Sequence, residues 1–321
     1  MVSRNMIRIK VMQSIYEHNM SERPDIIVER KNLLRSFDDM YILYIRILAM
    51  FGALTTIAEQ IIELKKQKFL PTQTDLHPNF KFVNNSFIQK IEENKLLQKY
   101  VREENLSWNN DVDLLFVRKI YDGISNQDFF IEYMQNHESS FEEDKKLVLT
   151  ILEKFMLENE DMNLYFGEQK LSWMHDYNDV IVLIHNTLKS ISKKQSDEKP
   201  LPPLFKIEPD GISEDRQFML NLLEKTIVNN AQYEQIIADK IRNWETDRIA
   251  SIDFILLKMA ICEFCEFSNI PLRVSMNEYI EISKYYSTPK SRFFINGLLD
   301  SVLEGLKKDN KINKQGRGLM G

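Results

Sequence analysis

The sequence contains few of the residues that interrupt helices. Among its 321 residues only 9 are glycine and 9 are proline. Long uninterrupted helices are therefore easy to accommodate, and a turn-rich β architecture is not expected. With 43% hydrophobic and 28% charged residues, the chain is long enough for two domains with substantial cores. The composition predicts an all-α protein.

Residues for metal or redox chemistry are also scarce. The 2 cysteines, Cys262 and Cys265, form an isolated C-x-x-C inside a helical pattern, with no second pair and no nearby histidine. The 5 histidines are scattered without metal-ligand spacing. A redox C-x-x-C needs a strand-to-helix context that is missing here. We expect two core thiols in a cytoplasmic protein, and no metal or cofactor.

Motifs of catalysis, secretion and membrane insertion are missing as well. Neither G-x-G-x-x-G nor a P-loop occurs, so we do not expect an enzyme. Arg8 and Lys10 interrupt the stretch that a secretory leader would need to be apolar. The run MYILYIRILAMFGAL (40–54) is short for a membrane span and carries Arg46, so it predicts a buried helix. A net charge of −6 disfavours indiscriminate binding of nucleic acid, so any basic patch must be local.

Helical patterns divide the chain into blocks. A helix-rich region runs from about residue 25 to 192, followed by the proline-containing linker SKKQSDEKPLPPLFKIEPDG (192–211), which predicts a domain edge. Beyond it, Ser213 opens a helix, and Ser275 with Glu278 predicts a capping box. The tail 308–321 is expected to be disordered.

The stretch STPKSRFF (287–294) predicts a helix start with unusual charges. Thr288 can cap, Pro289 fits the first helical position, and yet Lys290 and Arg292 occupy the first turn, where the helix dipole favours acids. Cations there strengthen a phosphate site, because unpaired N–H groups, dipole and side chains act on the same anion. Arg4 and Arg8 stand one turn apart at the other terminus and invite the same interpretation.

A plainer interpretation explains the same residues. The cations can pair with acids from the acidic middle region, and both Phe293 and Phe294 can belong to the core. At least one of the two rings must face inward. The other could stack on a base.

Several motifs in order resemble the NusB family of transcription antitermination factors. They are RIKVMQSIYEHN (8–19), with Gln13 and Tyr16, then MNEYIEISK (276–284) and FFINGLLD (293–300). The resemblance covers about residues 3–18 and 213–306 and is to long NusB-like proteins with an inserted block. It implies an all-α fold of NusB-like helical bundles with a large inserted helical domain. Residues 1–18 would be the first helix, 19–210 the insertion ending in the linker, and 211–307 the remainder.

The resemblance also implies a non-catalytic function. NusB-like proteins bind short boxA-type single-stranded RNA together with the ribosomal protein NusE, and help RNA polymerase read through terminators in rRNA transcription. Carried over by position, the RNA-binding candidates are Arg4, Arg8, Lys10, Tyr16, Lys290, Ser291, Arg292 and Phe294. The candidates for binding the protein partner are Asp247, Asp253, Asn277 and Glu278. An acidic patch would suit a basic ribosomal protein.

Two other functions stay open at this point. The NusB fold also forms the RNA-binding part of some ribosomal RNA methyltransferases, but their Gly-rich cofactor loop is missing from this chain. A protein-interaction scaffold of transcription or ribosome assembly, with weak or lost RNA binding, is the stronger alternative. It is favoured by a first helix that holds fewer arginines than is common in the family.

Overall fold

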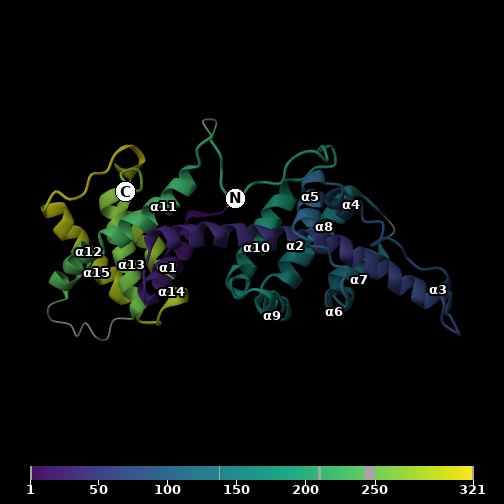
Figure 1. Ribbon diagram of the computed structural model, residues 1–321. Coiled ribbons are helices and arrows are strands. Elements are labelled where there is room, and N and C mark those ends of the chain that lie inside the picture. The colour runs from purple at the N-terminus through teal and green to yellow at the C-terminus, as the bar shows by residue number, and fades with distance from the viewer. Residues whose placement is uncertain (1, 137, 209–210, 242–249, 320–321) are drawn as a thin grey trace. The chain divides into compact units, whose positions relative to one another are not determined.

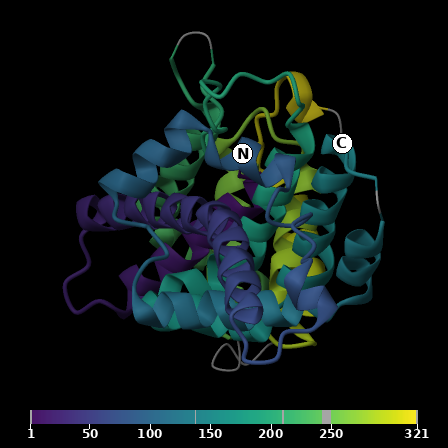
Figure 2. The ribbon, with the colours of Figure 1, turned by 90° about the vertical axis from the view of Figure 1, so that its right-hand side faces the viewer.

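The computed structural model describes residues 2–136, 138–208, 211–241 and 250–319. Within these ranges the chain forms helices joined by loops and no β-strand (Figures 1 and 2). The prediction of an all-α fold is confirmed. The chain divides into two compact units, one formed by Met1–Ser36 with Phe205–Gly321 (unit 1) and the other by Phe37–Leu204 (unit 2).

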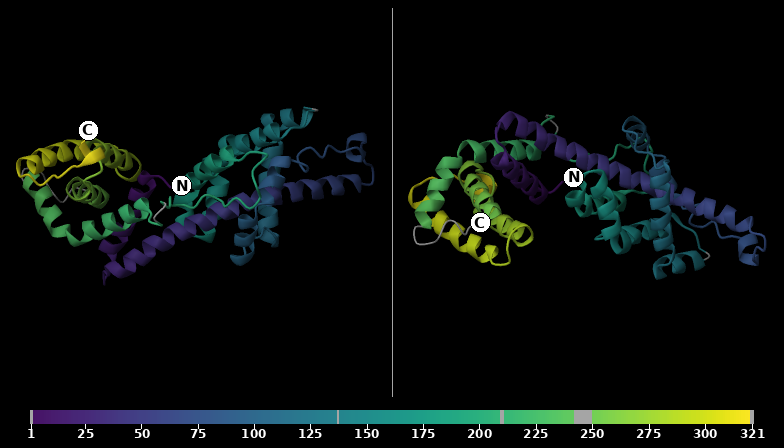
Figure 3. Two further views of the ribbon diagram at one scale, coloured as in Figure 1. Left: turned by 90° about the horizontal axis from the view of Figure 1, so that it is seen from above. Right: turned by 60° about the horizontal axis from the view of Figure 1, so that its bottom comes forward.

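Unit 1 is a bundle in which the first helix packs with helices from the end of the chain (Figure 3). Its elements are α1 (Arg4–Met20), the first part of α2 (Ile26–Lys66), α11 (Glu214–Val228), α12 (Asn230–Lys240), α13 (Ser251–Glu266), α14 (Leu272–Tyr286), α15 (Ser291–Lys308) and the 3-10 helix η3 (Gly316–Leu319).

Helix α13 lies at the centre of unit 1. Residues 255–264 are buried without exception, because the helix is apolar on nearly all sides and α1, α11, α12, α14 and α15 pack around it. Within this stretch the acid Glu263 is fully enclosed. A buried carboxylate requires partners, and these come from α1 and α14.

The C-terminal tail lies against the end of α13, although its sequence predicts disorder. The Lys314 ammonium donates to the carbonyl oxygens of Glu263, at 3.0 Å, and Phe267, at 2.8 Å. The Gln315 N–H donates to the Ser268 carbonyl at 3.0 Å. Carbonyls in the last turn of a helix lack intrahelical partners, and the tail supplies donors to them.

Unit 2 consists of the rest of α2 and a series of shorter helices. They are α3 (Gln73–Leu76), α4 (Ser86–Glu92), α5 (Lys95–Glu103), α6 (Asp111–Ser125), α7 (Asp128–Gln135), α8 (Phe141–Ile151), the π-helix η1 (Leu152–Met156), α9 (Glu160–Gln169) and α10 (Leu171–Ser190). Side-chain caps begin several of them; Asn85, Asn94 and Asn110 each accept from N–H groups of the first turn.

The apolar run 40–54 lies in α2 and is buried, as its sequence predicts. By length and composition α2 could cross a membrane, but 67% of its most apolar window is buried inside the protein. Arg46 pairs with Asp113 of α6 at 3.0 Å and lies 4.8 Å above the Trp108 ring. This cation is therefore neutralised within unit 2.

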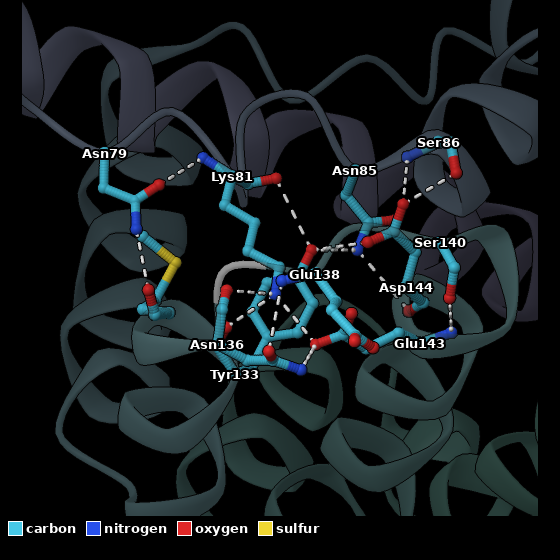
Figure 4. A network of polar contacts seen from close by, with 11 residues as sticks. Asn79, Lys81, Asn85, Ser86, Tyr133, Asn136, Glu138, Ser140, Glu143 and Asp144 are labelled. Atoms are coloured by element: carbon cyan, nitrogen blue, oxygen red, sulfur yellow. Dashed lines mark hydrogen bonds and ion pairs between the residues drawn. The ribbon is translucent and has the colours of Figure 1, made fainter.

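A polar network joins the loop before α4 to α7 and α8 (Figure 4). The Lys81 ammonium lies 4.3 Å from the centre of the Tyr133 ring and donates to two backbone carbonyls and to Glu143. The buried Asp144 carboxylate accepts from the Ser86 N–H and hydroxyl and from the Tyr133 hydroxyl. Burial, followed by the bond to Asp144, raises the pKa of Tyr133. The network has a structural role, since Lys81 pairs with Glu143 and both oxygens of Asp144 accept hydrogen bonds.

Candidate nucleic-acid interface

Helix α1 begins at a capping box and exposes one of its two predicted arginines. The Ser3 hydroxyl accepts from the Met6 N–H at 3.2 Å. The Arg4 guanidinium lies above the Phe218 ring, at 5.2 Å, and its Nε donates to Asp215 at 3.1 Å. It remains 41% exposed, so this pair is a surface pair that a phosphate could replace at small cost.

Arg8 has a structural role instead of the predicted contact with RNA. Its side chain is only 2% exposed and forms a bidentate pair with Glu263, with distances of 2.9 Å and 2.6 Å. Burial alone lowers the pKa of Arg8, but attraction and hydrogen bonds from Glu263 outweigh that effect and the pKa is raised. Arg8 is therefore always charged, and Glu263 balances this charge inside the bundle.

The other two candidates on α1 differ from each other in exposure. Lys10 is buried, at 5% exposure, because α1 is enclosed on more than one side and its polar face is narrow. Tyr16 is 39% exposed and stays available for contact. On α1 the candidates accessible to RNA are thus Arg4 and Tyr16.

Helix α15 begins two residues later than its sequence predicts. Its first residue is Ser291, and Lys290 occupies the N-cap without a side-chain cap. Lys290 and Arg292 are both exposed, and neither pairs with a carboxylate among the residues that the structure describes. The N–H groups of Ser291 and Phe293 donate to the carbonyls of Thr288, at 2.9 Å, and Lys290, at 3.2 Å. The two exposed cations are therefore the part of the predicted phosphate site that the structure retains.

Ser291 is buried instead of reaching RNA. It is 4% exposed, its hydroxyl donates to Asp253 at 2.6 Å, and it lies within 2.9 Å of the Ser287 hydroxyl and 2.8 Å of the Thr288 hydroxyl. Asp253 is itself 4% exposed and comes from the first turn of α13. Asp253 thus joins α13 to α15 rather than lying on a surface for a partner.

The exposed ring at the start of α15 is Phe293, not Phe294. Phe293 is 68% exposed and lies 4.5 Å from the Arg292 guanidinium, whereas Phe294 is half-buried. Tyr285, at the end of α14, is 82% exposed. Helical spacing in the sequence could have distinguished the two rings. Phe294 lies one turn before the buried Leu298 and so shares its inward face, while Phe293 lies one turn before Gly297.

Among the described residues, the remaining candidates for partner binding are Asn277 and Glu278. Asp247 falls outside the described residues. Asn277 is exposed, and Glu278 is half-buried and accepts from Asn5 at 2.9 Å and from Arg8 at 3.4 Å. The predicted capping box is not formed, because Ser275 lies inside α14 and its hydroxyl donates to Glu263 at 2.6 Å.

The two cysteines lie within the packed bundle of unit 1. Cys262 is buried and Cys265 half-buried, both as free thiols. Across the part of the chain that the structure describes, no group of three or more His, Cys, Asp or Glu side chains could hold a metal ion.

Fold and site together define an all-α protein with two exposed cations at the start of α15. The model of the NusB family matches residues 180–304, from the last turns of α10 to α15, and α1 lies outside that match. Proteins named transcription antitermination protein NusB are similar to the chain. That of Salinibacter ruber is 40% identical over 39% of this chain and 78% of its own length, and that of Listeria welshimeri is 37% identical over 35% and 96%. No solved structure matches the chain. The chain belongs to the NusB family.

Proposed function

We propose that this protein is a non-catalytic transcription antitermination factor of the cytoplasm. It binds a short boxA-type single-stranded RNA together with the ribosomal protein NusE and promotes transcription of rRNA through terminators. Family membership and the names of the relatives support antitermination as the role. The resemblance to NusB supports the finer description of RNA and partner.

The start of α15 is the single observation that carries RNA binding. Lys290 and Arg292 lie exposed and unpaired, within the described residues, beside N–H groups without a side-chain cap. The neighbouring Phe293 ring is exposed and offers a face for a base. Two exposed cations and an aromatic face at one point suit a single-stranded nucleic acid better than a protein surface.

Contacts in unit 1 support one NusB-like domain built from residues 1–18 and 211–307. Helix α1 packs on α11, α13 and α14, and the Arg8–Glu263 pair joins distant parts of the sequence. Residues 19–210 are then the insertion, and 308–321 form a tail. The exposed Asn277 and the half-buried Glu278 remain the candidates for binding the basic partner NusE.

The test compares binding of a short boxA-like RNA by fluorescence anisotropy, with and without NusE, at two salt concentrations. We expect wild type to bind more tightly with NusE. The variant Lys290→Glu/Arg292→Glu should weaken binding and reduce the salt dependence. The control is Lys307→Glu/Lys308→Glu, which changes the charge equally at the exposed other end of α15. Equal affinities of wild type and the Lys290→Glu/Arg292→Glu variant would show that the start of α15 does not bind RNA.

A scaffold with lost RNA binding is the second candidate. It is favoured by α1, where Arg8 and Lys10 are buried and Arg4 is paired. In a pull-down from lysate with RNA and protein both identified, the scaffold predicts capture of NusE without RNA. Capture of both would exclude it.

A further inference from the structure

The C-terminal tail carries an arginine to the start of α1. After α15 ends at Lys308, the chain returns to the C-terminal end of α13, where Lys314 and Gln315 bond to three carbonyl oxygens. Arg317 follows in η3. The tail is thus held by specific contacts within unit 1 two residues before this arginine.

Two glycines fit this docked conformation. A Cβ at Gly318 would lie 1.9 Å from the Ser268 carbonyl oxygen, closer than any side chain tolerates. Gly316 has φ of +51°, which costs most residues energy and glycine little. The sequence Gln-Gly-Arg-Gly (315–318) therefore suits a chain that passes tightly over the end of α13 and leaves Arg317 exposed.

Arg317 borders a groove that the predicted RNA-binding arginines also line. The groove has a volume of about 330 Å³, and Arg4, Arg8 and Glu278 contribute its charged wall. Ile270, Pro271 and Val274 contribute an apolar wall. Its volume falls within the range of pockets for small ligands, about 300–1,000 Å³.

Among the arginines of this groove, Arg317 is the one without a carboxylate partner in the described ranges. Arg8 is neutralised by Glu263 and Glu278. Arg4 pairs with Asp215 at 3.1 Å and with Glu214 at 3.7 Å. Arg317 is exposed and forms no ion pair within the described ranges. A phosphate entering the groove meets one free guanidinium in Arg317 and a second in Arg4, which can exchange its surface partner.

We propose that Arg317 is an RNA-binding residue that adds a second RNA contact, at the start of α1, to the one proposed at the start of α15. It contacts a phosphate beside Arg4, and the adjoining base packs on the apolar wall of the groove. This inference rests on the proposed RNA-binding function. RNA fits the groove better than an acidic peptide does, because one nucleotide supplies both the anion and the flat apolar body that the two walls receive.

The test uses the full chain and the same boxA-like RNA. Arg317→Ala should weaken binding about 3- to 10-fold and lower the salt slope by about one phosphate contact. The control Lys311→Ala removes one charge from the same tail, at a residue that pairs with Asp309 at 3.6 Å, and should leave affinity unchanged. Gly318→Val keeps every charge but displaces the tail, and should reproduce the loss seen with Arg317→Ala.

Three results would overturn the inference. If Arg317→Ala binds RNA as tightly as wild type while Lys290→Glu/Arg292→Glu binds more weakly, Arg317 has no role in RNA binding and the proposed function stands. No RNA binding by wild type would refute both. An acidic peptide that depends on Arg317 and does not compete with RNA would assign the groove to a protein partner.

Discussion

The Arg8 guanidinium and the Glu263 carboxylate form a buried bidentate pair, with distances of 2.9 Å and 2.6 Å, that joins α1 to α13. Ser275 and Tyr279 of α14 donate to the same carboxylate at 2.6 Å and 2.9 Å. Both carboxylate oxygens thus have two donors. Burial, followed by the charge of Glu263, raises the pKa of Tyr279, so its hydroxyl stays a donor.

Breaking this pair is expected to destabilise unit 1. Arg8→Ala leaves Glu263 buried without its counter-ion and should lower the free energy of unfolding by about 3–5 kcal/mol. Arg4→Ala, the matched change at an exposed pair, should cost about 1 kcal/mol or less. Urea denaturation with hydrogen exchange of α1 and α13 measures both. Equal costs would contradict the structural role of Arg8.

Removing the Ser291 hydroxyl should affect stability rather than RNA contact. Asp253 would lose its only donor, since its other carboxylate oxygen already has no hydrogen-bond partner among the described residues. We expect Ser291→Ala to cost about 1–3 kcal/mol, against little change for Ser301→Ala in the same helix. Weaker RNA binding at unchanged stability would instead identify Ser291 as a direct contact.

Replacing Phe293 and replacing Phe294 should affect different properties, RNA binding for the first and stability for the second. Phe293→Ala removes an exposed ring and should weaken RNA binding by about 1–3 kcal/mol with little change in stability. Phe294→Ala should chiefly lower the melting temperature, because that ring is half-buried. Anisotropy titration and thermal unfolding distinguish them, and the reverse pattern would return the stacking role to Phe294.

The two thiols should be unreactive in the folded protein. Burial raises the pKa of Cys262 to about 12 and that of Cys265 to about 11, from an ordinary 9.0. Because the unfolded thiols lose protons first, this stabilisation is present below pH 9.0 and is lost as the pH rises towards these folded values. A thiol reagent at about pH 8 should react slowly with native protein, at Cys265 first, and rapidly after denaturation. Fast labelling of Cys262 in the native state would contradict its burial.

The sequence by itself determined the all-α fold, the buried run 40–54 and the presence of two cations at the start of the last long helix. These follow from periodicity, from the scarcity of glycine and proline, and from the dipole of one helix, all of which are local properties. The family resemblance added the role in antitermination.

Only the tertiary structure decided which polar residues are buried and bonded to one another inside the bundle. Arg4 and Arg8 have the same chemistry and stand one turn apart, yet one is 41% exposed and the other 2%. The difference comes from Glu263, more than 250 residues further along the chain. Ser291 and Asp253, and the tail that carries Arg317, depend on contacts of the same kind. Pairings between distant segments arise from packing, which no local pattern of residues encodes.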